Sequence, residues 1–339
     1  MPVTRMLDYG MSYHDATTIH RESERGGSWD AVAVRLADAH LDRAVAATDR
    51  GHRETAVEAY RSAAVCLVFS QLAYNFDGDR KRELYCWLVD AFGRAAALDT
   101  RLAVQHLTVP FDGAALAGWL VRPPLTNSPP TVVLVGGQSG WGPAYFPAAR
   151  ALADRGIATL LAEIPGQGET RLLHGLHLKA DVHRAFSALA DHLLARGDLG
   201  AGLGVWGNSF GGLPAALAAA RDRRFTACCV NGAWAHPGIP TFRTAAEQAA
   251  AMVGSPDPAR IGEVFDALAF RPERDRLACP LLVLHGGADP LITRDDQQPF
   301  LDGADDATLR VWADGEHTLY NHAAERTAIV ADWFCDILR

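Results

Sequence analysis

The sequence predicts an α/β fold in which a mostly parallel sheet carries helices on both faces and follows a helical module. Before Leu98, apolar residues recur at the spacing of amphipathic helices. From Val104 the apolar pattern alternates, and strands then alternate with helices to the end of the chain. This order indicates a parallel sheet, because each parallel connection needs a crossover that covers one face.

The leading residues, 1–100, are expected to form an N-terminal helical domain. Residues 1–28 are polar, and we expect them to be irregular, with Ser28 capping a helix that begins at Trp29. The next helix has an apolar face made of Val57, Tyr60, Ala64, Val68 and Leu72. A further helix is expected from Arg80 to Leu98. Helix packing alone explains these apolar faces, and the alternative is that the module also closes over a catalytic face.

Residues 101–339 are expected to form the catalytic domain. Alternating residues on both sides of Asp112-Gly113 predict a β-hairpin, and the proline-rich residues 122–130 predict a loop. Further strands are expected at 131–135, 157–162, 203–206, 225–230, 281–284 and 308–312. Helices are expected at 146–154, 178–195, 213–220 and 322–338.

One insertion interrupts this alternation at residues 232–277. It contains two helical patterns, near 244–253 and 261–270. The insertion leaves the carboxyl end of a strand, where the loops of open α/β sheets build binding sites. We therefore expect it to form a helical cap over the sheet.

A serine lies at the apex of a predicted strand–turn–helix, in Gly207-Asn208-Ser209-Phe210-Gly211. Glycines two residues before and after a serine are typical of a nucleophile elbow, where the turn is too tight for a side chain. The helix N-terminus that follows favours negative charge. The alternative is a structural glycine-rich turn with an inert serine.

A serine nucleophile needs a histidine base and an acid that orients it. Asp289 follows the strand 281–284, and His317 follows the strand 308–312, so both lie just beyond strand ends and in the order serine, acid, histidine. We expect these three residues to form a catalytic triad. We expect the other candidates near these strand ends to be structural or solvated residues: His285, His322, Asp295, Asp296, Asp314 and Glu316.

An oxyanion formed at the serine needs backbone N–H donors. We expect the N–H of Phe210, which follows the serine, to be one donor. The second should come from the glycine-rich loop after the strand 131–135, with the N–H of Gln138 preferred and that of Gly137 next. The alternative is that this loop is only a flexible turn.

These motifs resemble those of the α/β-hydrolase superfamily over residues 104–339. More narrowly, the chain resembles the branch with an N-terminal helical domain, which includes 2,6-dihydroxypseudooxynicotine hydrolase and fungal polyketide-shortening hydrolases. The resemblance rests on the helical leader, the hairpin and the motifs Leu134-Val135-Gly136-Gly137, Ile164-Pro165-Gly166-Gln167-Gly168-Glu169, Gly207–Gly212, Gly286-Gly287-Ala288-Asp289 and Gly315-Glu316-His317. It implies the α/β-hydrolase fold, a site between the helical domain and the sheet, and cleavage of acyl bonds that includes carbon–carbon bonds beside a ketone.

The chain departs from this branch just after the Gly-Gly turn. The nicotine-pathway hydrolase has an acidic residue there, which the resemblance implicates in carbon–carbon cleavage, whereas this chain has Gln138-Ser139. Glu169 is the candidate replacement acid, with helix capping or pairing with Arg171 as its alternative role. Ser139 and Trp141 are further candidate substrate contacts.

Composition narrows the class of protein. The formal charge of −8 argues against nucleic-acid binding, and no apolar run is long enough to span a membrane. The N-terminus lacks the apolar segment of a secretory signal, and six cysteines without metal-like spacing indicate free thiols, so we expect a cytoplasmic protein. His174, His177 and His183 lack the spacing of a zinc site, and neither a metal nor a cofactor is expected. A homodimer is left open.

The sequence thus predicts a serine hydrolase that cleaves an ester, thioester or β-dicarbonyl carbon–carbon bond of a small acyl or ketone substrate, in a secondary-metabolic setting. Two alternatives stay open. One is a non-hydrolytic acyl transferase or cyclase on the same fold, and the other is a binding protein with an inactive site.

Overall fold

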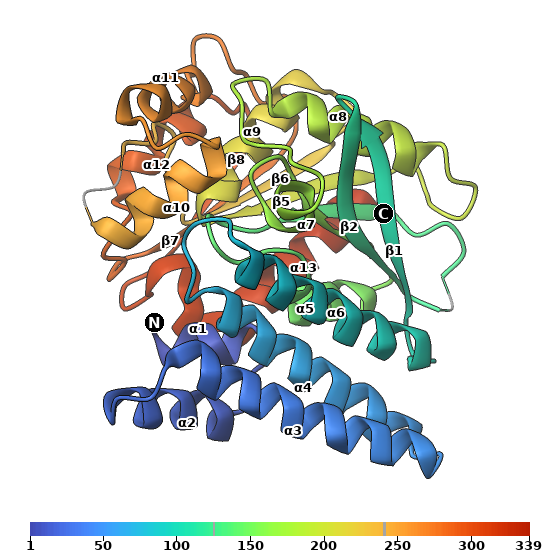
Figure 1. Cartoon of the computed structure of the whole chain (residues 1–339). Helices are drawn as coiled ribbons and strands as arrows, with labels where there is room; N and C mark the ends of the chain where they lie inside the picture. The colour runs from blue at the N-terminus through green and yellow to red at the C-terminus, as the bar shows by residue number, and fades with distance from the viewer. Residues whose placement is uncertain (125, 240–241) are drawn as a thin grey trace.

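The computed structural model of the chain describes residues 1–124, 126–239 and 242–339 (Figure 1). The predicted loop 122–130 and the predicted insertion 232–277 therefore each include positions, 125 and 240–241, that lie outside the described residues. No helix in the described ranges is long and apolar enough to cross a membrane.

A sheet of eight strands in the order β1-β2-β4-β3-β5-β6-β7-β8 forms the centre of the protein. Strand β2 is antiparallel to both of its neighbours, β1 and β4, and every other pairing is parallel. The strands are β1 (Ala103–Phe111), β2 (Ala114–Arg122), β3 (Thr131–Val135), β4 (Ala158–Glu163), β5 (Leu203–Asn208), β6 (Ala227–Asn231), β7 (Leu281–Gly286) and β8 (Ala307–Trp312). The predicted α/β-hydrolase fold is confirmed.

Local sequence explains these strands. Asp112 and Gly113 both have positive φ, 46° and 77°, as a two-residue type I′ hairpin turn between β1 and β2 requires. Strands β3 to β7 are buried on both faces, so they appear as continuous apolar runs rather than alternating ones.

Two hydrophobic cores cover the two faces of the sheet. In β3, Val132 and Leu134 belong to one core, and Val133 and Val135 belong to the other. The first core is completed by α6 (Phe146–Ala153) and α13 (Ala323–Leu338), and the second by α8 (His183–Leu194) and α9 (Gly212–Arg221). The predicted helix 178–195 begins later than expected, at His183.

Five helices form the N-terminal module, which packs against the same face as α6 and α13 (Figure 1). They are α1 (Val3–Asp8), α2 (Tyr13–Glu24), α3 (Trp29–Asp49), α4 (Arg53–Gln71) and α5 (Asp79–Leu98). The expectation that residues 1–28 are irregular is wrong. Ser12 caps α2 by accepting the N–H of Asp15, and Met6 and Ile19 are fully buried, so tertiary packing stabilises two helices that composition did not indicate.

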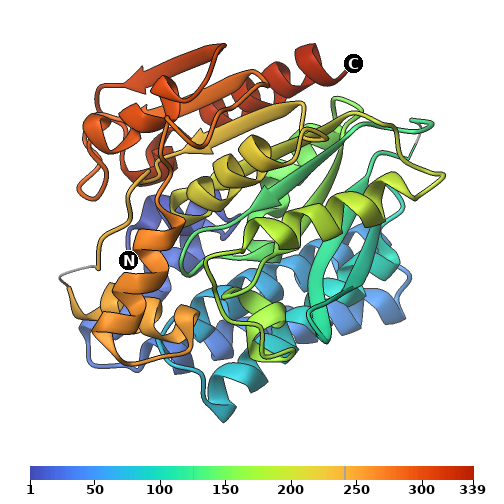
Figure 2. The same ribbon diagram turned by 90° about the horizontal axis from the view of Figure 1, so that it is seen from above.

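The insertion after β6 contains α10 (Arg243–Val253) and α11 (Pro258–Leu268), and α12 (Arg294–Asp302) follows β7. Figure 2 shows the insertion, coloured orange, beside the N-terminal end of the chain. Asn75, in the turn between α4 and α5, donates a hydrogen bond to Glu247 (2.7 Å) and accepts one from Gln248 (3.1 Å). The helical module and the insertion are thus in direct contact on α10.

Candidate active site

Ser209 lies at the tight turn between β5 and α9, on the short 3₁₀ helix η2 (Ser209–Gly211). Its φ is +52°, a left-handed value that is costly for a serine. A Cβ at Gly207 would lie 2.2 Å from the carbonyl oxygen of Gly211, and a Cβ at Gly211 would lie 2.2 Å from that of Gly136. Only glycine fits at these two positions, so the predicted reason for the Gly-x-Ser-x-Gly spacing holds.

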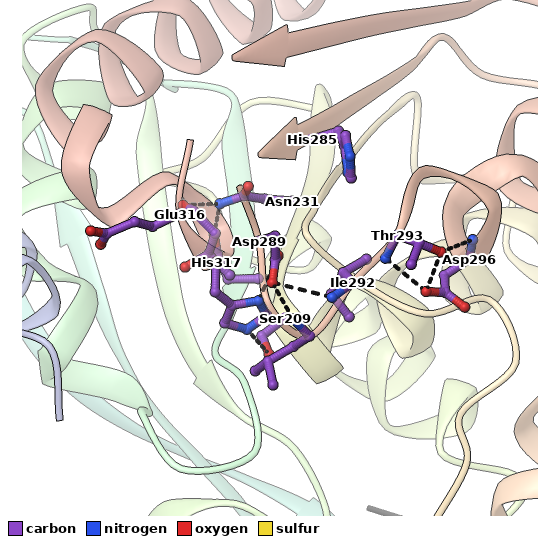
Figure 3. Close-up of polar contacts among 12 residues, drawn as sticks. Ser209, Asn231, His285, Asp289, Ile292, Thr293, Asp296, Glu316 and His317 are labelled. Atoms are coloured by element: carbon purple, nitrogen blue, oxygen red, sulfur yellow. Dashed lines mark hydrogen bonds and ion pairs between the residues drawn. The ribbon is translucent and has the colours of Figure 1, made fainter. Parts of the chain in front are cut away.

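Three side chains converge at this turn (Figure 3). His317 Nε2 lies 2.8 Å from Ser209 Oγ, and His317 Nδ1 lies 2.8 Å from Asp289 Oδ2. The Asp289 side chain is fully buried, and its Oδ1 accepts the N–H groups of Leu291 (2.8 Å) and Ile292 (3.1 Å). The backbone therefore fixes the carboxylate, which in turn orients the imidazole.

The rival residues are engaged elsewhere. His285 Nδ1 contacts Gln297 in a buried pair, and His322 contacts Asp314 at 2.9 Å. Asp296 forms the capping box of α12 with Thr293. None of these contacts reaches Ser209.

Asn231, at the end of β6, links the serine turn to the histidine turn and was missed by the sequence analysis. Its Nδ2 donates to Asn208 Oδ1 (2.8 Å) and to the carbonyl oxygen of Thr318 (3.0 Å). Thr318 itself has a φ of +52°, so the chain turns sharply just after His317. The signal in the sequence was a polar residue at the end of a fully buried strand.

The loop after β3 approaches Ser209 closely. A Cβ at Gly137 would lie 2.9 Å from the Cβ of Ser209. From behind, Trp141 Nε1 donates to the carbonyl of Gly137 (3.1 Å), and Gln167 Nε2 donates to the carbonyls of Gly136 (2.8 Å) and Gly137 (3.0 Å). In a trans peptide the N–H points opposite to the carbonyl, so the N–H groups of Gly137 and Gln138 are turned away from Trp141 and Gln167.

Ser209 and His317 open into a cavity of about 540 Å³. The insertion and the loop after β7 supply apolar lining residues, including Trp234, Ile239, Phe242 and Leu291. The N-terminal module and the loops beside β3 and β8 supply polar ones, including Arg5, Tyr9, Ser139, Tyr145 and Tyr320. A second cavity of about 360 Å³, between α4 and α6, does not include Ser209.

The remaining predicted contacts divide into two groups. Gln138 and Ser139 line the cavity, and Gln138 Nε2 donates to the carbonyl of Ala245 on α10 (2.6 Å). Trp141 does not line it, because it is 97% covered and lies behind the loop. Phe210 is also buried, and its ring packs against Phe265 of α11.

Glu169 is the clearest error among the candidate residues. It lies on the short helix α7 (Gly168–Leu172), is buried, and does not line the cavity. Its carboxylate contacts His106 at 3.1 Å, and His174 lies 3.7 Å away. The alternative role of pairing with Arg171 is also not seen for these two described residues, because Arg171 contacts Asp77. Glu169 is thus placed to bind two histidines rather than a substrate.

Glu163, at the end of β4, is a buried acid that none of the sequence motifs indicated. Tyr85 of α5 donates to it, as does the N–H of Glu169 (2.5 Å). Burial raises the pKa of Glu163 from 4.5 to about 7. A Cβ at Gly142 would lie 2.3 Å from its carboxylate, so Glu163 packs directly behind the loop that reaches Ser209.

This raised pKa makes a prediction about stability. Between pH 4.5 and about 7, the folded protein keeps a proton on Glu163 that the unfolded chain has lost, so stability should fall as the pH rises through this window. The free energy of unfolding of the wild type relative to Glu163→Gln should fall by about 1–3 kcal/mol across it. Urea unfolding at a series of pH values measures this difference. The exposed Glu263→Gln is the control, and a wild type and Glu163→Gln with parallel pH profiles would contradict the prediction.

Among the described residues, one group places three metal-ligand atoms within 4.8 Å of each other, namely Asp15, His40 and Cys66. His40 Nε2 already contacts Asp15 at 2.9 Å. Burial raises the pKa of the Cys66 thiol, which keeps it protonated and a poor ligand. Asp15 and His40 therefore form a hydrogen-bonded pair, and Cys66 is a buried thiol beside them.

The sheet order and a serine on a strand-to-helix turn define an α/β-hydrolase. The family model of the prolyl oligopeptidase family matches residues 144–339, more than half of the chain, and the chain belongs to this family. Its relatives are hydrolases, and the chain is an enzyme of this class.

Individual relatives cover nearly the whole chain. The 2,6-dihydropseudooxynicotine hydrolase of Paenarthrobacter nicotinovorans is 28% identical over 343 residues, which cover 98% of this chain and 91% of the relative. The crystal structure of 2,6-dihydroxy-pseudo-oxynicotine hydrolase matches with a TM-score of 0.89 at 24% identity, covering 99% of this chain and 95% of that one. Wild-type AbyA5 matches with a TM-score of 0.68 at 19% identity, covering 92% and 90%. These two structural likenesses show the fold, including its N-terminal helices.

Proposed function

We propose that the chain is a serine hydrolase that cleaves an acyl bond of a small organic substrate through an acyl-enzyme on Ser209. The observation that carries this proposal is the pair of 2.8 Å contacts that His317 makes, with Ser209 on one side and Asp289 on the other. The strained φ of Ser209 supports it further, because such strain persists where function requires the geometry.

In this mechanism Ser209 Oγ attacks the substrate carbonyl while His317 Nε2 accepts the serine proton. Asp289 holds the proton on Nδ1 of His317 and stabilises the imidazolium that forms. His317 then protonates the leaving group, and water attacks the acyl-enzyme with His317 again as the base. In each of these steps the proton is accepted or donated by the same atom, His317 Nε2.

The negative oxygen of the tetrahedral intermediate needs donors beside Ser209. We propose that the N–H groups of Phe210 and Gln138 bind it, with that of Gly137 as the alternative to Gln138. The support for Gln138 and Gly137 is the orientation of the loop, since Trp141 and Gln167 hold the carbonyls of Gly136 and Gly137 on the side away from the N–H groups of Gly137 and Gln138.

The leaving group sets the reaction that this site favours. No carboxylate is among the described residues that line the cavity, and we propose that His317 protonates the departing group. Esters, thioesters and β-diketones leave as alcohols, thiols or enolates that need one proton, whereas an aryl carbanion needs a stronger, dedicated acid. We therefore propose activated acyl compounds, including secondary metabolites of the polyketide type, as the substrate class.

A substrate panel tests this proposal. The wild type should hydrolyse p-nitrophenyl butyrate, a butyryl thioester and an aryl β-diketone, with little turnover of a simple aryl ketone of equal size. Release of the product acid by chromatography measures all four reactions. Exclusive cleavage of the aryl ketone would show that an acid outside the triad acts, and transfer of the acyl group to an added alcohol without hydrolysis would favour an acyl transferase.

A further inference from the structure

The helix α1 places a cation in the active-site cavity. Arg5 lies among the residues that line the cavity, and its Nη2 donates to Ser139 Oγ at 3.1 Å. Its guanidinium carbon lies 5.2 Å from the ring centre of Tyr9 and 5.9 Å from that of Tyr320. The side chain therefore lies against the rings of Tyr9 and Tyr320 in the cavity, and it contacts the loop that approaches Ser209.

Arg5 is half-buried, and it differs from two buried arginines near it, Arg61 and Arg326, because no carboxylate contacts it in the described structure. Arg326 pairs with Asp8 at 2.7 Å, and Arg61 pairs with Asp99. The hydrogen-bond partners of Arg5 are instead the Ser139 hydroxyl and the sulfur of Met1 at 3.6 Å, and its Nε is buried without a hydrogen-bond partner. A guanidinium has five N–H donors and favours bidentate contact with a planar anion.

The charges around the cavity leave this cation uncompensated. The described lining residues include no aspartate or glutamate, although the chain as a whole carries a formal charge of −8. Burying a charge without a partner is unfavourable. A ligand that brings its own negative charge would satisfy the Nε and the remaining donors of Arg5 together.

Arg5 and Ser209 are placed so that the two ends of one small molecule could contact them at the same time. Gly137 contacts Ser209, and Arg5 contacts Ser139, two residues further along the same loop. The Cα atoms of Gly137 and Ser139 are at most about 7 Å apart, so the two contacts lie close together along one loop and a single small molecule can reach both Ser209 and Arg5. Trp234 and Phe242 also line the cavity and provide apolar surface for the rest of such a substrate.

We propose that the substrate carries a carboxylate a few bonds from the scissile carbonyl and that Arg5 binds this carboxylate. The proposal rests on the proposed hydrolase function and adds the substrate class to it. Arg5 acts on specificity: it binds the substrate at a distance from the reacting atoms, so it should contribute mainly to KM and to the choice between charged and neutral substrates.

Matched esters test the proposal. Mono-p-nitrophenyl adipate carries a terminal carboxylate, and p-nitrophenyl adipamate replaces it with a neutral amide of the same size. For the wild type, kcat/KM on the adipate ester should exceed that on the adipamate ester by about 10- to 100-fold, the range for a hydrogen bond to a charged group. Arg5→Gln should remove most of this ratio, and Arg5→Lys should restore part of it. A second pair of esters, m-carboxyphenyl butyrate and phenyl butyrate, carries the carboxylate on the leaving group or lacks it. Their kcat/KM values test whether Arg5 binds a carboxylate of the leaving group instead.

The controls separate the possible failures. Arg35→Gln, an exposed arginine paired with Glu22 on the helical module, should leave both rates at the wild-type level. Equal rates on charged and neutral members of both ester pairs, or an Arg5→Gln variant that lowers both members equally, would overturn the role of Arg5 while the hydrolase function stands. If the wild type cleaves none of these esters and also neither the thioester nor the β-diketone of the substrate panel, the proposed function fails, and calorimetric binding of free adipate to wild type and Arg5→Gln then decides the anion site alone. Adipate bound equally by both proteins, or by neither, overturns it.

Discussion

Ser209→Ala is expected to lower kcat by about 10³-fold or more on any substrate that the wild type turns over, because it removes the atom that forms the acyl-enzyme. The residual rate should reflect substrate binding and the N–H donors beside residue 209. A fluorophosphonate should label the wild type at this serine and should fail to label the variant. The effect belongs in kcat rather than KM, since the serine bonds to the substrate only during the reaction.

A second serine in the chain provides a matched control. Ser128 has a φ of +50°, nearly the same left-handed value as Ser209, but it is exposed in the loop before β3. Ser128→Ala should keep wild-type activity, and thermal unfolding of both variants separates backbone effects from chemical ones. Full activity in Ser209→Ala, or labelling at another residue, would refute the nucleophile.

The predicted positions that the structure reproduces rest on short-range patterns. The serine turn is dictated by two glycines whose substitution would clash with the backbone, and this requirement is visible within five residues. Asp289 and His317 are far apart in sequence, but each follows a strand, and parallel strands bring their carboxyl ends to one edge. Because the topology follows from the order of strands and helices, the contact between Asp289 and His317 can be predicted from the sequence.

The errors and omissions concern contacts between distant segments. Residues 1–28 are polar, so nothing local indicates that Met6 becomes buried or that Arg5 lines the cavity. Glu169 follows a strand as Asp289 does, yet the helix α7 turns its carboxylate toward His106 on the edge strand β1. A strand end predicts proximity to the site, but the direction of the side chain depends on the next turn.

The sequence left open whether the helical module only packs against the catalytic domain or also closes over a catalytic face. In the structure the module contributes residues to the cavity beside Ser209. It supplies Arg5 and Tyr9 to the cavity, and its turn at Asn75 is hydrogen-bonded to α10 of the insertion. Tyr85 of α5 also reaches through to Glu163, behind the loop beside Ser209. The module thus contacts both the cavity and the back of the loop that approaches the serine.

Asp289→Asn should also remove most of the activity, for a reason set by the backbone. The N–H groups of Leu291 and Ile292 donate to Oδ1 of Asp289, so an asparagine would place its oxygen there and turn its NH₂ group toward His317. His317 Nδ1 would then have to accept that hydrogen bond, which leaves the proton on Nε2. A protonated Nε2 cannot accept the proton of Ser209.

The expected loss in kcat is about 10⁴-fold, the scale known for this tautomer effect in a serine protease triad. Asp314→Asn is the matched control, since Asp314 also contacts a histidine, His322, but at an exposed position away from Ser209. Its activity should equal that of the wild type, and both variants should unfold at similar temperatures. An Asp289→Asn enzyme within about tenfold of the wild type, a difference of only about 1.4 kcal/mol, would mean that Asp289 does not set the tautomer of His317 and that the proposed triad is wrong.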